Sequence, residues 1–244
     1  MNRLILLSGF QLLAFATVSQ LGTSSLRAAD PNALTAAEVA AGWECLSNEN
    51  ARSLWISIGK DRFPDQGWVF ENGELVLAKA SKGGDITTKK HYLNFELVWE
   101  WRIGKGGNSG VKYNLPKPNA NVGFEYQLLD NESHADRKTP SHRTASLYDL
   151  IAAPDDAPVK NAGEWNQSRL LVDGNRVEQW LNGSKTASFE IGSENLKSLI
   201  ERSKYKKTLG FGEKVASPIL LQDHGDEVHF RGVKIRELSS PAPK

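Results

Sequence analysis

The chain has 244 residues, and its 30 lysines and arginines nearly balance its 29 aspartates and glutamates. Mixed charges with almost no net charge offer no basic surface for nucleic acid or for an anionic membrane. The single cysteine, Cys45, cannot form an internal disulfide, so the fold must depend on a hydrophobic core, and a chain of this length can bury one.

The first residues differ in character from the rest of the chain. Arg3 precedes a mostly apolar run over residues 4–18, and small and polar residues follow up to Ala29. This layout is typical of a secretory signal peptide, and the run is short for a membrane span. An uncleaved N-terminal anchor is the alternative. We expect residues 1–29 to be removed on export, leaving a soluble periplasmic or secreted protein with no membrane insertion.

Two short helices are predicted in the remaining chain. Residues 35–41 begin with a capping box formed by Thr35 and Glu38. Residues 193–204 show apolar residues at helical spacing behind a serine cap at Ser193.

Most of the other residues are predicted to form strands and tight turns. The pairs Asn72-Gly73 and Asn182-Gly183 separate apolar runs and are strong hairpin signals, and a third turn is expected at Gly174. Strands are expected at residues 94–103, 111–113, 124–129, 168–172, 177–181, 185–190, 219–223 and 228–238. Many short strands with few helices and no internal linker predict an all-β fold of two packed antiparallel sheets. We expect one domain over residues 30–238 and a disordered tail over 239–244.

Alternation along the strand at residues 94–103 separates two faces. Trp99 and Trp101 point to one face, which we expect to be the core. Glu100 and Arg102 point to the other, which is either a solvated sheet surface or the floor of a polar groove. The chain has seven tryptophans, which either fill the core or offer flat surfaces to sugar rings.

Further polar side chains gather on predicted strands and turns. Glu125 and Gln127 share a face of their strand, and Gln222 shares one with His224, which precedes a glycine turn. The turns add Asp85, Asn108 and Tyr148 as residues able to reach a ligand. The chain lacks the spacing of a zinc site, the Gly-x-Ser-x-Gly elbow and the usual carboxylate pattern of β-sandwich glycosidases.

Several motifs, in chain order, resemble the bacterial 3-keto-disaccharide hydrolase family over about residues 42–238. They are Gly83-Gly84-Asp85, Glu100-Trp101-Arg102, Gly107-Asn108-Ser109-Gly110, Glu125-Tyr126-Gln127, Ser146-Leu147-Tyr148, Gly163-Glu164-Trp165, Trp180-Leu181-Asn182-Gly183 and Leu221-Gln222-Asp223-His224-Gly225. Phe124 and Gly232 depart from the family pattern, which often has proline and asparagine there. The resemblance implies a concanavalin A-like jelly roll that acts on glycosides oxidised to a ketone at carbon 3.

Such a ketone makes the hydrogen on carbon 2 acidic, so a base can remove it and the group on carbon 1 can leave by β-elimination. Addition of water then completes a net hydrolysis. The reaction needs a base, a stabiliser of the enolate oxygen and an acid for the leaving group. We expect Glu125 as the base, His224 as the acid and Arg102 as the positive charge. The expected substrate-binding residues are Asp85, Glu100, Asn108, Gln127, Tyr148 and Gln222.

No cofactor is assigned, although Asp85 and Glu125 would suit a divalent metal ion if one takes part. The resemblance implies an oxidised sugar or glycoside as substrate and a glycoside 3-dehydrogenase as the upstream enzyme. Two alternatives stay open: a sugar-binding module on the same fold without turnover, and a glycosidase with a non-standard site.

Overall fold

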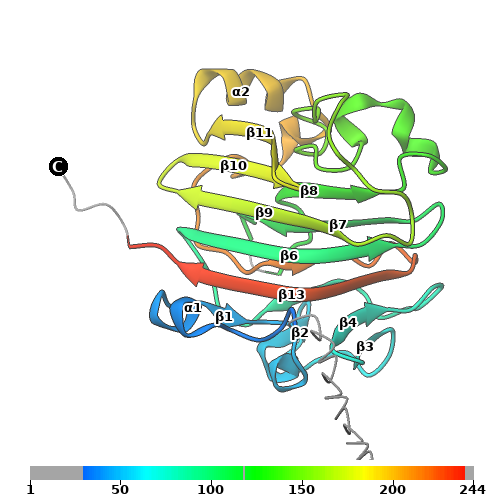
Figure 1. The fold of residues 1–244 in the computed structure, drawn as a ribbon. Helices are drawn as coiled ribbons and strands as arrows, with labels where there is room; N and C mark the ends of the chain where they lie inside the picture. The colour runs from blue at the N-terminus through cyan, green and yellow to red at the C-terminus, as the bar shows by residue number, and fades with distance from the viewer. Residues whose placement is uncertain (1–29, 118, 240–244) are drawn as a thin grey trace, which may run out of the picture.

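The computed structural model describes residues 30–117 and 119–239 (Figure 1). The expected signal peptide and nearly all of the expected tail therefore lie outside the described residues. Within the described part of the chain, no helix is both long and apolar enough to cross a membrane.

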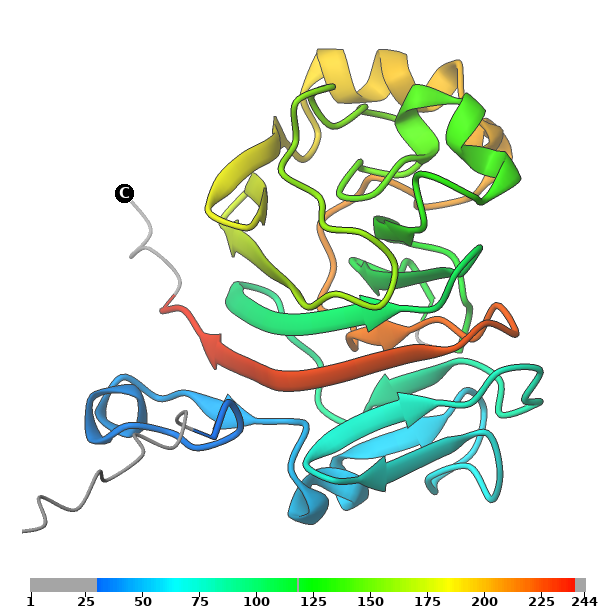
Figure 2. The same cartoon turned by 45° about the vertical axis from the view of Figure 1, so that its right-hand side comes forward.

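Two antiparallel sheets pack face to face, and the all-β two-sheet jelly roll predicted from the sequence is confirmed (Figures 1 and 2). The larger sheet has the order β11-β10-β9-β6-β13-β4-β3, with β1 beside β13. Its strands are β1 Glu44–Cys45, β3 Trp68–Glu71, β4 Glu74–Leu77, β6 Phe95–Ile103, β9 Asn166–Asp173, β10 Arg176–Leu181, β11 Ser184–Glu190 and β13 Val228–Glu237.

The smaller sheet has the order β2-β5-β12-β7-β8. Its strands are β2 Trp55–Ser57, β5 Ile86–Thr88, β7 Asn108–Tyr113, β8 Phe124–Leu129 and β12 Leu220–Leu221. The predicted strand at residues 219–223 is thus shorter than expected. The backbone N–H of Gln222 nevertheless donates to Gly110 O at 3.0 Å, which keeps this segment against β7.

Two hairpin turns form where the Asn-Gly pairs predicted them. Asn72 and Gly73, between β3 and β4, have φ of 52° and 74°. Asn182 and Gly183, between β10 and β11, have φ of 47° and 86°. Two successive positive φ values give the turn whose twist matches that of the flanking strands, and asparagine and glycine adopt them at the least cost.

The core between the sheets holds the indoles of β6. Trp99 and Trp101 are 2% and 1% exposed, as the alternation predicted. The ring centroid of Trp99 lies 4.9 Å from that of Tyr126 on β8, in an edge-to-face arrangement. Trp101 Nε1 donates to Ser168 Oγ at 2.9 Å, so its polar group is satisfied inside the core. Glu100 and Arg102 consequently point away from the core, on the outer face of the larger sheet.

The helices lie outside the sheets. The predicted capping box starts α1 (Ala36–Ala40), and Ser193 caps α2 (Glu194–Glu201). Short 3-10 helices are η1 Glu49–Leu54, η2 Ala135–Lys138, η3 Pro140–His142 and η4 Lys204–Lys207. Helix α2 and the connection between β8 and β9 gather at one end of the sandwich in both views (Figures 1 and 2).

Candidate active site

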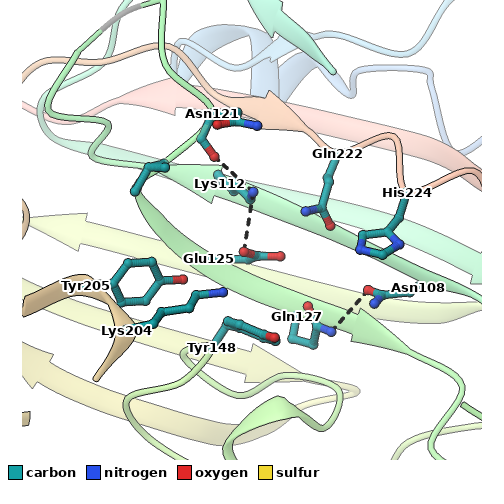
Figure 3. Close-up of a pocket in the computed structure, with 12 residues that line it drawn as sticks. Asn108, Lys112, Asn121, Glu125, Gln127, Tyr148, Lys204, Tyr205, Gln222 and His224 are labelled. Carbon is teal, nitrogen blue, oxygen red and sulfur yellow. Dashed lines mark hydrogen bonds and ion pairs between the residues drawn. The ribbon is translucent and has the colours of Figure 1, made fainter. Parts of the chain in front are cut away.

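A pocket of about 210 Å³ opens on the outer face of the smaller sheet (Figure 3). Strands β7 and β8 form its floor, because Phe124, Tyr126 and Leu128 point into the core and the residues between them point outward. Its lining residues come from both strands, from the β7–β8 connection, from the segment after β12, from the β8–β9 connection and from η4: Asn108, Lys112, Asn121, Val122, Gly123, Glu125, Gln127, Tyr148, Lys204, Tyr205, Gln222 and His224.

Glu125 occupies the floor and is only 5% exposed. Burial raises the pKa of its carboxyl group, because the charged form is poorly solvated there, and the positive charges of Lys112 and Lys204 partly offset this rise. Gly110 faces Glu125 from β7, and a Cβ atom at Gly110 would stand 2.4 Å from Glu125 Oε1. The absence of a side chain at Gly110 therefore makes room for the carboxylate.

Lys112 is the cation nearest to Glu125. Its Cα is paired with that of Glu125 across β7 and β8, and Lys112 Nζ lies 3.5 Å from Glu125 Oε2. Lys112 Nζ also donates to Asn121 O at 3.0 Å, and the residue is 7% exposed. The ammonium group is thus held between a carboxylate and a carbonyl.

Two amides continue the polar floor beside Glu125. Gln127 and Asn108 bring their side-chain amides to 3.2 Å of each other (Figure 3). With its amide rotated by 180°, Gln127 donates to Glu125 Oε1 and to Ser109 O, both at 3.2 Å. Gln127 therefore supports the carboxylate as well as the pocket floor.

Tyr148 and Lys204 face each other at the opposite side of the pocket. Lys204 Nζ lies 4.1 Å from the centroid of the Tyr148 ring. Tyr148 donates its hydroxyl to Asp136 Oδ2 at 3.1 Å, and burial together with that carboxylate raises the pKa of the phenol. His142 stacks on Tyr148 with ring centroids 4.3 Å apart, and its two ring nitrogens face carboxylate oxygens of Asp136 and Asp149 at 2.9 and 3.1 Å.

His224 and Gln222 complete the pocket at the β12 side, and Asp85 lies outside the lining. His224 is exposed at the rim. Gln222 Oε1 is buried, and no donor among the described residues reaches it. Asp85 stands beside the pocket and accepts a hydrogen bond from the backbone N–H of Asp223 at 2.8 Å. Burial raises the pKa of Asp85, and that hydrogen bond opposes the rise.

Arg102 and Glu100 are not in this pocket, and the expectation that they share a groove with Glu125 must be corrected. Both lie on the outer face of the larger sheet, across the core from Glu125. Arg102 donates to Glu74 Oε2 at 3.2 Å, and Glu100 accepts from Arg231 Nε at 2.7 Å. Alternation assigns residues to one face of a strand, but it does not tell which of two sheets that strand joins.

The sequence analysis overlooked Lys112 and Lys204. Lys112 had a usable signal, since it alternates with Val111 and Tyr113 and so shares an outward face with Gly110. Lys204 had none, because it lies in a polar stretch after a helix and reaches the pocket only through the tertiary fold. Asn121, on the β7–β8 connection, and Tyr205, on η4, reach the pocket in the same way.

Within the described residues, no three or more His, Cys, Asp or Glu side chains are grouped so that they would hold a metal ion. Asp85 and Glu125, the pair expected to suit a divalent cation, are two carboxylates without a third ligand of these types.

Comparisons with known proteins agree with this fold. The chain is 31% identical over 250 residues to a 3-keto-disaccharide hydrolase of Bacteroides thetaiotaomicron, over 88% of this chain and 85% of that protein. A solved structure from Parabacteroides distasonis, provisionally assigned as a glycosyl hydrolase, has 33% identity and a TM-score of 0.75, and the match covers 85% of this chain and 99% of that one. A second from the same species has 25% identity and a TM-score of 0.63, over 80% and 99%. A family model described as a 3-keto-alpha-glucoside-1,2-lyase-like domain matches residues 42–236, and the chain belongs to this family.

Proposed function

We propose that this protein cleaves 3-keto-glycosides by removing the proton on carbon 2 and eliminating the group on carbon 1, with addition of water giving net hydrolysis. The observation that carries the proposal is Glu125, a buried carboxylate with a raised pKa that faces a pocket beside two lysines. A base whose pKa lies nearer the working pH is better matched to abstract a weakly acidic proton. The name of the Bacteroides relative and the description of the family point to the same substrate class.

The steps balance without an external oxidant or reductant. Glu125 takes the proton from carbon 2, and the electrons of that bond form the enolate of carbons 2 and 3. The enolate re-forms the ketone as a double bond develops between carbons 1 and 2, and the bond from carbon 1 to the leaving oxygen breaks. His224, at the rim where an aglycone leaves, protonates that oxygen. Water then adds at carbon 1 and a proton returns to carbon 2.

Polar groups around Glu125 are suited to binding sugar hydroxyls. Gln222 Oε1 is a buried acceptor that a substrate hydroxyl would satisfy, and a buried acceptor without a donor is costly to leave unpaired. Asn108 and Gln127 supply further donors and acceptors on the floor. Tyr148 lines the pocket, and Asp85, outside that lining, interacts electrostatically with Glu125; both would help to orient the ring.

The pocket favours an enzyme over the two alternatives. A sugar-binding module owes most of its affinity to tryptophan platforms, yet none of the seven tryptophans, all within the described residues, lines this pocket. The two lining tyrosines, Tyr148 and Tyr205, already stack on His142 and Phe211 and carry the ammonium of Lys204. A conventional glycosidase needs two carboxylates across the scissile bond, and Glu125 is the only acid among the described residues that line it.

Incubation with a 3-keto-glucoside beside its unoxidised parent tests the proposal. The wild type should release the aglycone from the keto sugar alone, since only the ketone acidifies carbon 2. Glu125→Gln should lose this activity while its melting curve still shows a folded protein. Equal cleavage of both sugars, or a fully active Glu125→Gln variant, would refute the proposal.

Two further parts of the proposal concern cellular context. Residues 30–238 would act as one catalytic domain outside the cytoplasm after removal of residues 1–29, for which the support is the signal-peptide pattern of the sequence. Mass spectrometry of the natural protein should find residue 1 absent and no N-terminal lipid. Because the substrate carries a ketone, an enzyme that oxidises glycosides at carbon 3 must act before this one.

A further inference from the structure

The proposed reaction develops negative charge on the ketone oxygen, and a fixed positive charge there is the largest single aid a site offers to such a step. Arg102 cannot supply it, because it lies on the other sheet. No arginine is among the described residues that line the pocket, and two lysines, Lys112 and Lys204, are.

Lys112 is already committed to other partners. Its ammonium lies 3.5 Å from Glu125 Oε2 and donates to Asn121 O at 3.0 Å. Turning toward a substrate oxygen would break contacts that Lys112 makes while 7% exposed. Its positive charge instead acts on Glu125, where it opposes the rise in pKa that burial causes.

Lys204 is differently placed. Its ammonium rests on two aromatic rings, 4.1 Å from the centroid of Tyr148 and 5.1 Å from that of Tyr205. Across residues 30–117 and 119–239, no side chain or carbonyl accepts a hydrogen bond from Lys204 Nζ, so its three donors remain for a ligand. Figure 3 shows the ammonium on the side of the pocket facing Glu125.

The backbone that carries Lys204 is fixed. Its N–H donates to Asp149 Oδ2 at 2.9 Å, and Ser203 caps the turn by accepting from the N–H of Tyr205 at 3.0 Å. Burial lowers the pKa of Lys204, whereas the negative charges of Glu125 and Asp149 raise it. These two carboxylates oppose the effect of burial without cancelling it, so the pKa of Lys204 stays below its ordinary value. Because Lys204 is exposed, solvent screens part of the field of its ammonium.

We propose that Lys204 is a catalytic residue whose ammonium binds the carbon-3 oxygen of the substrate and stabilises the enolate, an assignment that rests on the function proposed above. As Glu125 takes the carbon-2 proton, the ketone oxygen gains the charge that Lys204 faces. When the leaving group departs, the ketone re-forms and Lys204 keeps its protons throughout. Base and cation thus stand on opposite sides of one pocket, one on β8 and one on η4.

Steady-state kinetics on a 3-keto-glucoside test this assignment with three variants. Lys204→Met should lower kcat by about 10²-fold, the usual loss for one oxyanion partner, with a smaller change in KM. Lys204→Arg retains the charge and should give a kcat between those of Lys204→Met and the wild type. Lys206→Met removes an exposed lysine from the same turn and should match the wild type.

Other results would overturn the assignment. If Lys204→Met leaves both kcat and KM unchanged, Lys204 has no role in the reaction. If Lys204→Met raises KM alone, Lys204 only binds the substrate. An Arg variant as inactive as the Met variant would exclude a purely electrostatic role, and a sugar adduct on Lys204 after borohydride reduction would then identify an imine. A wild type inactive on every 3-keto-glucoside would remove the proposed function and this inference together, whereas an active wild type with an active Lys204→Met removes the inference alone.

Discussion

At the scale of single residues, Glu125 is subject to opposing influences on its pKa. Burial favours the neutral acid, and the ammonium of Lys112 at 3.5 Å favours the carboxylate. The balance leaves the pKa above the ordinary carboxyl value of 4.5. A base whose pKa is raised in this way is stronger, once deprotonated, than an exposed glutamate.

The pH dependence of kcat/KM should report this balance. The base works only when deprotonated, so activity should rise with pH through a midpoint above 4.5. Lys112→Met removes a charge that lowers the pKa of Glu125, so the midpoint should move to higher pH. Lys105→Met, an exposed lysine on the β6–β7 loop, is the control and should leave it in place. A midpoint that moves down in Lys112→Met would contradict the assignment of Glu125 as the base.

Gly110→Ala tests the space reserved for the carboxylate. The new methyl group would stand 2.4 Å from Glu125 Oε1 and force the carboxylate aside. A displacement of about 1 Å at a reacting group can cost about 10²-fold in rate, so kcat should fall by about that factor. Gly104→Ala is the matched control, because the nearest atom to its Cβ would be 3.5 Å away. Equal activity of the two variants would show that the position of Glu125 is not critical.

At the scale of elements, the β8–β9 connection and η4 are joined behind the pocket by one polar cluster. His142 has a carboxylate oxygen at each ring nitrogen, and donation at both requires both nitrogens to carry protons. Asp149 links this ring to the backbone of Lys204, and Asp136 links it to the hydroxyl of Tyr148. The cluster thus positions two pocket residues, although His142, Asp136 and Asp149 do not themselves line the pocket.

His142→Ala should therefore affect both stability and catalysis. Loss of hydrogen bonds to charged groups should lower the free energy of unfolding by about 1.5–3 kcal/mol. It should also lower kcat more than it raises KM, because Lys204 and Tyr148 lose their supports. His91→Ala, at an exposed histidine outside the pocket, should change neither quantity. Denaturant unfolding and steady-state kinetics measure both, and a variant that unfolds earlier with unchanged kcat would show the cluster to be structural only.

Local patterns predicted the elements well and the assembled site in part. The Asn72-Gly73 turn, the capping box of α1 and the burial of Trp99 follow from short-range chemistry that the sequence displays. The position of Arg102 cannot be predicted from short-range chemistry, because the side of the sandwich on which it lies depends on which sheet β6 joins. Lys204 is brought to Glu125 by long-range packing alone, and no nearby residue signals this.

At the scale of the whole molecule, the two outer faces of the sandwich have different chemistry. The smaller sheet presents the pocket. The larger sheet presents ion pairs and indoles, with Arg102 paired to Glu74 and its guanidinium carbon 5.1 Å from the ring centroid of Trp165. Arg231 and Arg236 are likewise paired on this face, with Glu100 and Glu96 of the same sheet.

Arg102→Gln tests this separation of faces. The variant should keep kcat and KM close to those of the wild type, because the core lies between Arg102 and the pocket. Its free energy of unfolding should change by no more than about 1 kcal/mol, since a partly exposed ion pair contributes little. A folded Arg102→Gln protein without activity would contradict the placement of the site on the smaller sheet.

Nuclear magnetic resonance of turnover in D₂O tests the proposed chemistry most directly. If Glu125 removes the proton on carbon 2, the sugar released from a 3-keto-glucoside should carry deuterium at carbon 2 or have a double bond between carbons 1 and 2. This product should form at the same rate as the aglycone is released. Glu125→Gln and enzyme-free samples correct for spontaneous exchange of this acidic position. Release of the aglycone with the original hydrogen still on carbon 2 would contradict the mechanism.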